Sequence, residues 1–191
     1  MAKKESTFTN MFLTLLIVTA ISSLAASSVY NLTKGPIAEV QRLKLQKAIG
    51  QVMPGFTDIE RVSLIPKDGG DSLIFFKGFE NDKDLGVAVK TYTNLGYSGL
   101  IKLMVGFKPD GTINNVEVLE HKETPGLGTK MADAFFKDQF KNKNPKTFKL
   151  SVVKDGGDVD AITAATITSR AFCDGVMRAY DTFEEMKQEN K

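Results

Sequence analysis

The sequence predicts an α+β protein, in which one N-terminal transmembrane helix precedes a single domain with a mostly antiparallel sheet and flanking helices. Two observations carry this prediction. Residues 6–33 contain no charged side chain and are rich in apolar residues. Beyond them, segments with helical spacing of apolar residues alternate with short β-type runs that are bounded by Gly, Pro and Asp. We therefore expect a membrane segment with a short tip over residues 1–33 and a domain over residues 34–191.

The N-terminal segment is long enough to cross a bilayer. Its apolar centre covers residues 11–29, close to the roughly 20 residues that a transmembrane helix needs. Lys3 and Lys4 precede it, which favours a cytoplasmic N-terminus and an extracytoplasmic domain. A cleaved signal peptide is the alternative, with Ser23-Leu24-Ala25 as the small-x-small site. The apolar run continues past that site, which favours a permanent anchor.

Composition limits the chemistry of the chain. Its 191 residues allow one sizeable domain with an appendage, and a net charge of +2 does not favour nucleic acid as a partner. Cys173 and His121 are the only residues of their types, so an intrachain disulfide, a four-cysteine cluster and a multi-histidine metal site are excluded. Redox chemistry would therefore need an organic cofactor or a partner.

The remaining elements follow from periodicity and turn residues. Lys34-Gly35-Pro36 is expected to end the membrane helix, and Ile37–Met53 is expected to form a separate amphipathic helix. Phe135 is expected in the core. Strands are predicted at residues 58–65, 72–78, 85–92, 100–107, 113–119 and 148–153, turns at 67–71 and 108–111, and further helices at 130–140 and 169–188.

Two stretches are candidates for ligand binding. Residues 160–169 crowd small and hydroxyl side chains before a helix, a pattern that favours a bound phosphate, and Thr166 and Thr168 are suitable N-cap residues. A plain helix cap after a tight turn is the alternative. Residues 121–128, HKETPGLG, leave a strand as a polar loop, where ligand contacts are common. An ordinary connection to the next helix is the alternative there.

The two stretches carry a resemblance to known proteins. Residues 96–128 read GYSGLIKLMVGFKPDGTINNVEVLEHKETPGLG, and residues 154–172 read KDGGDVDAITAATITSRAF. Together they closely resemble the G subunits of Rnf ion-translocating oxidoreductases. They are less closely similar to the C subunits of sodium-translocating NADH:quinone reductases. Both groups belong to the FMN-binding domain family, and the resemblance covers essentially the whole chain.

The resemblance implies a covalent FMN. In that family a flavin transferase moves FMN from FAD onto a threonine in a motif like D-x-x-(S/T)-G-A-T-x-(S/T), so the acceptor here would be Thr166, linked through the FMN phosphate. The other matching positions are Asp160, Thr163, Ala165 and Thr168. Ala164 stands where glycine is usual, and its methyl group restricts a conformation with positive φ.

Further flavin contacts are implied for the loop and its surroundings. Glu123 and Thr124 would donate or accept hydrogen bonds, and Gly126 and Leu127 would line the ring. Additional candidates are Tyr97, Ser98 and Lys154. A lysine near the pyrimidine side of the ring would favour the anionic reduced form, and Lys154 is the candidate for this role. The alternative is that Lys154 is a solvated residue of a turn.

The implied function is electron transfer within a membrane-bound, ion-translocating oxidoreductase complex linked to ferredoxin and NAD. The chain would act as an enzyme only as a subunit of that complex. Its partners would be membrane and peripheral subunits, a flavin transferase during maturation, and lipid of a bacterial or archaeal cytoplasmic membrane that it crosses once. An anchored flavoprotein that donates electrons outside any ion pump is the alternative. A binding module in which Ala164 has abolished flavin attachment is a third hypothesis.

Overall fold

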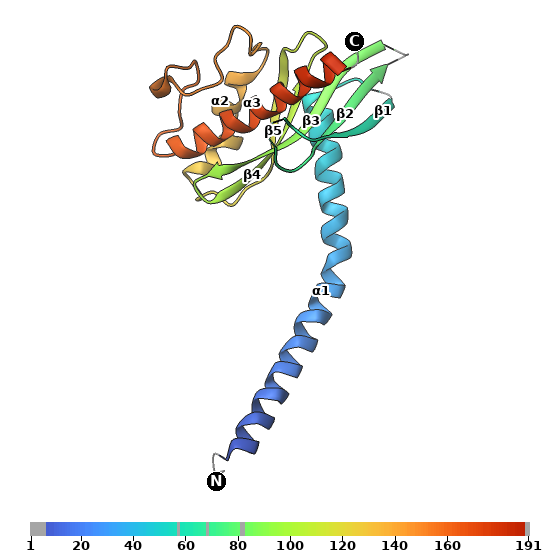
Figure 1. Ribbon diagram of the computed structural model, residues 1–191, viewed down its shortest axis with the longest axis vertical. Helices are drawn as coiled ribbons and strands as arrows, with labels where there is room; N and C mark the ends of the chain where they lie inside the picture. The colour runs from blue at the N-terminus through green and yellow to red at the C-terminus, as the bar shows by residue number, and fades with distance from the viewer. Residues whose placement is uncertain (1–6, 57, 68, 81–82, 190–191) are drawn as a thin grey trace. The chain divides into compact units, whose positions relative to one another are not determined.

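A computed structural model describes residues 7–56, 58–67, 69–80 and 83–189 of the chain. It separates into two compact units, one ending at Lys44 and one spanning Leu45–Lys191, which are described separately. The α+β class predicted from the sequence is confirmed (Figure 1). The elements are α1 (Phe8–Val52), β1 (Asp58–Leu64), β2 (Leu73–Glu80), β3 (Lys83–Gly96), β4 (Gly99–Phe107), β5 (Ile113–Glu120), the 3₁₀ turn η1 (Gly128–Ala132), α2 (Ala134–Lys137), η2 (Asp138–Phe140), η3 (Val153–Asp155) and α3 (Thr166–Glu189).

Helix α1 is continuous, so the predicted break at Gly35-Pro36 was wrong. Pro36 lacks an N–H group, and the carbonyl of Leu32 therefore loses its intrahelical donor. Good helix formers after Pro36, such as Ala38, Glu39 and Gln41, carry the helix on to Val52. The second compact unit begins at Leu45, within this helix.

The apolar part of α1 is long and apolar enough to cross a membrane. Its hydroxyl side chains bond back to helix carbonyls, as those of Thr19 to Leu15 at 2.9 Å and Ser28 to Leu24 at 2.8 Å show. This internal bonding lowers the cost of placing hydroxyl groups in an apolar environment. Lys3 and Lys4, on which the predicted orientation depends, lie outside the described residues, as does Asp68 of a predicted turn.

The sheet is antiparallel throughout, with the strands in chain order from β1 to β5. The five predicted strands at its positions are confirmed. Alternation places successive residues on opposite faces. Val87 and Val89 belong to the core under α3, whereas Ala88 between them packs against Ile49 and Val52 at the end of α1.

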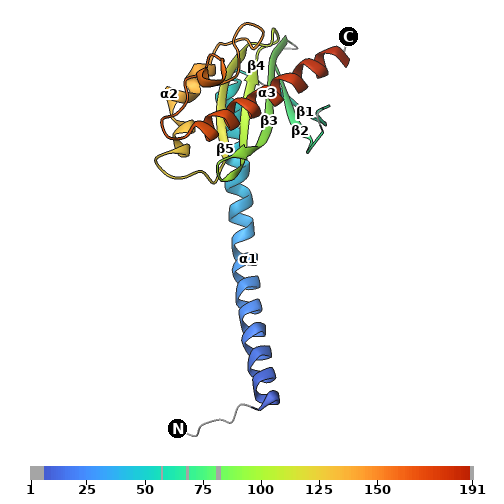
Figure 2. The same ribbon diagram turned by 60° about the vertical axis from the view of Figure 1, so that its left-hand side comes forward.

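Helix α3 crosses one face of the sheet, as the two views agree (Figure 2). Its predicted apolar face is confirmed as buried: Phe172, Val176, Tyr180 and Phe183 are each at most 8% exposed. Two polar contacts add to this packing. The Thr91 hydroxyl donates to the Gly175 carbonyl at 3.0 Å, and the Thr93 hydroxyl donates to Asp174 at 2.6 Å.

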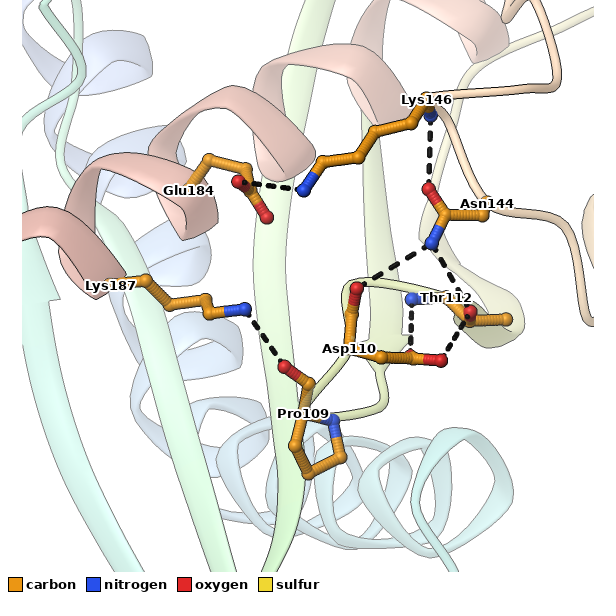
Figure 3. Close-up of polar contacts among 7 residues, drawn as sticks. All are labelled: Pro109, Asp110, Thr112, Asn144, Lys146, Glu184 and Lys187. Atoms are coloured by element: carbon orange, nitrogen blue, oxygen red, sulfur yellow. Dashed lines mark hydrogen bonds and ion pairs between the residues drawn. The ribbon is translucent and has the colours of Figure 1, made fainter.

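The C-terminal half of α3 is held at the β4–β5 turn (Figure 3). Lys187 donates to the Pro109 carbonyl at 2.9 Å, and Glu184 lies 3.4 Å from the Lys146 ammonium group. Within the turn, the backbone N–H of Thr112 donates to Asp110 at 2.8 Å, and this bond lowers the pKa of the Asp110 carboxyl group. The position of α3 is thus fixed at the end far from its N-terminus.

Two predicted elements between β5 and α3 were wrong. The helix expected at 130–140 is three short turns, because Asp133 adopts extended backbone between η1 and α2. Consequently Phe136 is buried and Phe135 is 61% exposed. The strand expected at 148–153 is reduced to one parallel bridge from Val152 to Val159. The backbone N–H of Lys149, in the same predicted strand, donates to the Asp158 side chain and not to a neighbouring strand.

Candidate functional site

A cavity of about 500 Å³ lies at the N-terminal end of α3. Its size falls within the roughly 300–1,000 Å³ typical of small-molecule clefts. Three segments wall it: the β3–β4 turn, the loop after β5 (residues 121–128, here the exit loop), and the stretch leading into α3 (residues 160–168, here the acceptor segment). The lining residues are Tyr97, Glu123, Thr124, Leu127, Gly128 and 164–168. A cavity of about 600 Å³ beside the second half of α3 contains none of the predicted site residues.

The acceptor segment enters the helix through a tight turn. Ala164 has φ +61°, the left-handed conformation in which glycine is favoured. Helix α3 then begins at Thr166, three residues earlier than predicted, and its first backbone bond runs from Ser169 N–H to the Ala165 carbonyl. The N–H groups of residues 166–168 therefore have no intrahelical acceptor. The interpretation of Thr166 as an N-cap was wrong, since Thr166 lies within the helix.

Thr168 is not a cap either, because its hydroxyl donates to Glu123 at 2.8 Å. The Glu123 side chain is 5% exposed, and its second oxygen accepts the Ser98 N–H at 3.0 Å. Both oxygens act as acceptors, which is the bonding pattern of a carboxylate. Three of the predicted site residues are thus brought together around the buried Glu123 carboxylate, with Ser98 on the exposed side.

The exit loop is folded by its own backbone. Gly126 has φ +76° and donates its N–H to the Thr129 hydroxyl at 2.9 Å. Leu127 N–H donates to the Thr124 carbonyl at 3.2 Å, and the Leu127 side chain is 41% exposed at the cavity. The His121 ring accepts the Glu123 N–H at 3.2 Å. The loop therefore presents one apolar side chain to the cavity from a closed turn.

Five predicted site residues lie outside the cavity lining, and two of them, Ser98 and Gly126, belong to the turns that wall it. Asp160 is exposed, and its backbone is bonded in both directions by the Gln139 amide group, at 2.8 and 3.1 Å. Thr163 is exposed in the turn before Ala164. Lys154 is exposed in η3, next to Asp155, whose pKa is lowered by its hydrogen bonds from Arg170.

Sequence reasoning missed several residues of the site. Ile167 lines the cavity and is 48% exposed, and Gly128 lines it beside Glu123. Gln139 holds the acceptor segment from a distant part of the chain. In the sequence, Gly128 was indicated only as part of the loop at residues 121–128. No residue near Gln139 in the sequence indicates its contact with Asp160.

The arrangement suits a ligand with an anionic group and a flat ring. The N–H groups at the start of α3, which have no intrahelical acceptor, favour an anion, and the partly exposed Thr166 lines the cavity there. Tyr97, Leu127 and Ile167 offer exposed apolar surface around the opening. The fold and the site together define a nucleotide-binding domain of the flavin type, and the FMN-binding domain family matches residues 96–181, which include all three walls.

Comparison with whole proteins is more specific. The chain is 30% identical over 176 residues to the G subunit of the ion-translocating oxidoreductase complex of Methanosarcina acetivorans, covering 91% of this chain and 93% of the relative. It is 30% identical to the G subunit of the Na(+)-translocating ferredoxin:NAD(+) oxidoreductase complex of Acetobacterium woodii, covering 92% and 91%. The crystal structure of NqrC from Shewanella oneidensis matches with 32% identity and a TM-score of 0.46, over 62% of this chain and 61% of that one. The chain belongs to the family of G subunits of ion-translocating oxidoreductase complexes.

Proposed function

We propose that this chain is the electron-transfer subunit of a membrane-bound, ion-translocating oxidoreductase complex linked to ferredoxin and NAD, and that it carries FMN covalently bound through phosphate to Thr166. The family membership and the FMN-binding domain support the electron-transfer role. FMN, when bound, supplies the capacity to take up electrons and pass them on. The residues of the chain have to attach, orient and shield it.

The choice of Thr166 rests on a comparison of the three threonines in the acceptor segment. Thr168 is 1% exposed and its hydroxyl is engaged by Glu123. Thr163 is exposed but lies outside the cavity lining. Thr166 is the threonine of the three that combines partial exposure, a place in the cavity wall and a hydroxyl without a hydrogen-bond partner among the described residues. This observation carries the proposal.

Attachment is a phosphoryl transfer that balances with FAD as donor. The Thr166 Oγ forms a bond to the phosphorus of the FMN half, the pyrophosphate bond of FAD breaks, and AMP leaves. The hydroxyl proton passes to a base of the flavin transferase or to water. The resulting phosphodiester keeps one negative charge, and the helix N-terminus stabilises it by about 0.3–1 kcal/mol.

The remaining wall residues would hold the ring. Leu127 and Ile167 come from opposite walls and give apolar contact, and Tyr97 contributes an aromatic ring at the opening. Thr124 brings a hydroxyl group to the same wall as Leu127. Glu123 has both oxygens engaged within the protein, so its predicted hydrogen bond to the flavin would be additional to these.

The membrane placement rests on α1. A helix apolar enough to span a bilayer, in a family of subunits of ion-translocating complexes, indicates an anchored protein. We propose that residues 1–33 anchor it and that the flavin domain lies on the extracytoplasmic side, since Lys3 and Lys4 precede the span. Residues 11–29 carry no carboxylate, so the ion path is assigned to other subunits.

The attachment is tested by co-expressing the full chain with a flavin transferase and recording flavin fluorescence in the band after denaturing electrophoresis. The wild-type band should fluoresce, and intact mass should rise by one FMN less one water. Thr166→Val should abolish both signals, whereas Thr163→Val should retain the FMN mass. Dark bands for intact wild-type protein with an active transferase would refute the covalent link. Purification of the tagged chain with its complex, or alone, separates the pump subunit from an anchored flavoprotein outside any pump.

A further inference from the structure

We propose that Glu123 is a positioning residue that joins the three walls of the cavity and thereby sets the orientation of the flavin on Thr166. The inference rests on the proposed function, because it concerns a flavin attached at that residue. The sequence predicts Glu123 as a direct flavin ligand. The contacts of its two oxygens support a different role, in which Glu123 acts through the segments that it holds.

Each contact of the Glu123 carboxylate belongs to a different wall. Glu123 itself belongs to the exit loop, Ser98 in the β3–β4 turn donates its backbone N–H to Oε1, and Thr168 in α3 donates its hydroxyl to Oε2. The partners lie 25 and 45 residues away along the chain. One side chain therefore connects all three segments that line the cavity.

Two glycines allow this close arrangement. A Cβ atom on Gly128 would lie 2.5 Å from Glu123 Oε2 and 2.9 Å from Thr168 Oγ1. A Cβ atom on Gly96 would lie 2.8 Å from Glu123 Oε1. The backbone at Gly128 and Gly96 therefore approaches the two oxygens of Glu123 more closely than a residue with a side chain could. The carboxylate is left with little room to change position.

Burial makes the contacts hard to break. At 5% exposure, an oxygen of Glu123 that lost its partner could not be fully solvated without the walls moving apart. Thr168 is also 1% exposed. Separation of the walls would therefore leave both the Glu123 carboxylate and the Thr168 hydroxyl without their hydrogen bond, so the contact between them resists opening.

The contact between Glu123 and Thr168 controls the direction of the Thr166 side chain through helix geometry. Thr166 and Thr168 are two positions apart in α3, so their side chains diverge by about 200° around the helix axis. Holding Thr168 against Glu123 fixes the rotation of the first turn of α3. That rotation decides how the Thr166 oxygen, and the phosphate attached to it, enter the cavity.

The test compares Thr168→Val, which removes the donating hydroxyl with little change in shape, with Thr168→Ser, which keeps it. Thr91→Val is the matched control, because it removes another buried threonine hydroxyl bond between the sheet and α3, to the Gly175 carbonyl at 3.0 Å and outside the cavity lining. Full-length protein in detergent is first checked for attached FMN by intact mass. Time-resolved anisotropy of the flavin fluorescence then measures its local motion.

In the FMN that is attached, we expect Thr168→Val to increase the amplitude of fast motion at least twofold. Thr168→Ser and Thr91→Val should match the wild type. Hydrogen exchange on protein without flavin gives an independent measurement. Amides of residues 96–99, 124 and 126–128 should exchange about tenfold faster in Thr168→Val and at the wild-type rate in Thr91→Val.

A second pair of variants addresses Glu123 itself. Glu123→Ala should loosen the flavin and both amide segments. Glu123→Gln should restore them, because its amide oxygen can accept from Ser98 while its NH₂ group donates to a reoriented Thr168 hydroxyl. Wild-type anisotropy and exchange in both Thr168→Val and Glu123→Ala would overturn the positioning role and leave the FMN attachment intact. Absence of FMN from the wild type would refute the attachment. The hydrogen-exchange data would still decide whether Glu123 holds the three walls together.

Discussion

The sheet with α3 and the stretch between β5 and α3 are held together by different forces. In the sheet, neighbouring strands exchange backbone hydrogen bonds over long runs, and the side chains between the sheet and α3 are mostly apolar. In residues 121–165, backbone hydrogen bonds mostly close short turns, and side chains supply further bonds to the backbone. Gln139 bonds Asp160 in both directions, and the Asp158 side chain accepts the Lys149 N–H.

This difference separates stability from function. A ladder of backbone bonds keeps its geometry when one side chain is lost, whereas its stability depends mainly on buried apolar area. A loop held by a few side-chain contacts has no such redundancy, so one substitution can move it. We therefore expect core substitutions to lower the free energy of unfolding strongly, and substitutions near the cavity to change flavin geometry at a smaller cost in stability.

The largest effect is expected where the two regions meet. Phe172 of α3 is fully buried, and its ring lies 5.2 Å from that of Phe136 and 4.9 Å from that of Phe140. Phe172→Ala should lower the free energy of unfolding by about 3–5 kcal/mol, because it leaves a cavity among the three rings. Urea unfolding of the full chain in detergent, followed by circular dichroism, measures this change.

Phe135→Ala is the control for that experiment, since the Phe135 side chain is 61% exposed. It should change the unfolding free energy by less than about 0.5 kcal/mol. Equal effects of the two substitutions would contradict the packing of residues 134–140 on α3. The contrast between the sheet with α3 and the stretch between β5 and α3 would then not hold at their contact.

An intermediate effect is expected at Gly128, where an added methyl group would meet Glu123 Oε2 at 2.5 Å. Gly128→Ala should cost about 1–3 kcal/mol of stability through overpacking. It should also loosen the flavin, because the contact between Glu123 and Thr168 has to open. Urea unfolding and flavin anisotropy measure the two effects on the same sample.

Gly50→Ala provides the matched control for an added methyl group. Gly50 lies inside α1 with nothing within 4 Å of the new Cβ, so alanine should stabilise the helix by about 0.5–1 kcal/mol and leave flavin motion unchanged. If Gly128→Ala behaved in the same way as Gly50→Ala, the close approach around Glu123 would have no consequence for the site.

The same contrast decides how much of the fold could be predicted. Strands such as β4 and β5 were predictable, because apolar and β-branched residues on both sides of the turn at residues 108–111 are local signals. The helix expected at 130–140 failed because its apolar spacing resembles a helix while Asp133 is extended, which no neighbouring residue indicates. The break at Pro36 failed because one missing donor is a small loss in a helix of 45 residues.

The site was predictable only where it is continuous in sequence. The acceptor segment and the exit loop are short motifs, and the expectation that residue 164 requires a positive φ agrees with its φ of +61°. The contacts from Glu123 to Ser98 and Thr168 bridge distant parts of the chain and leave no local pattern. Sequence motifs could therefore name the wall residues but not the bonds that hold the walls together.

The smallest effect is expected at Ala164, which adopts a left-handed conformation that costs an L-residue with a Cβ atom about 1–2 kcal/mol. Ala164→Gly removes this strain but makes the unfolded chain more flexible, which returns about 0.4–1 kcal/mol. The net result should be a gain of up to about 1 kcal/mol in the free energy of unfolding, measured by urea unfolding.

Asn142→Gly is the matched control, because Asn142 has φ +57° and its side chain accepts a hydrogen bond from Lys108 at 3.0 Å. Asparagine tolerates the left-handed conformation better than alanine, so glycine should stabilise the protein less at residue 142 than at residue 164. A loss of stability in Ala164→Gly would mean that the alanine methyl group, which lies in the cavity wall, contributes packing that outweighs the backbone strain. Strain at the acceptor turn would then be no obstacle to flavin attachment, and the effect of alanine at this position would have to arise in its contact with the ligand.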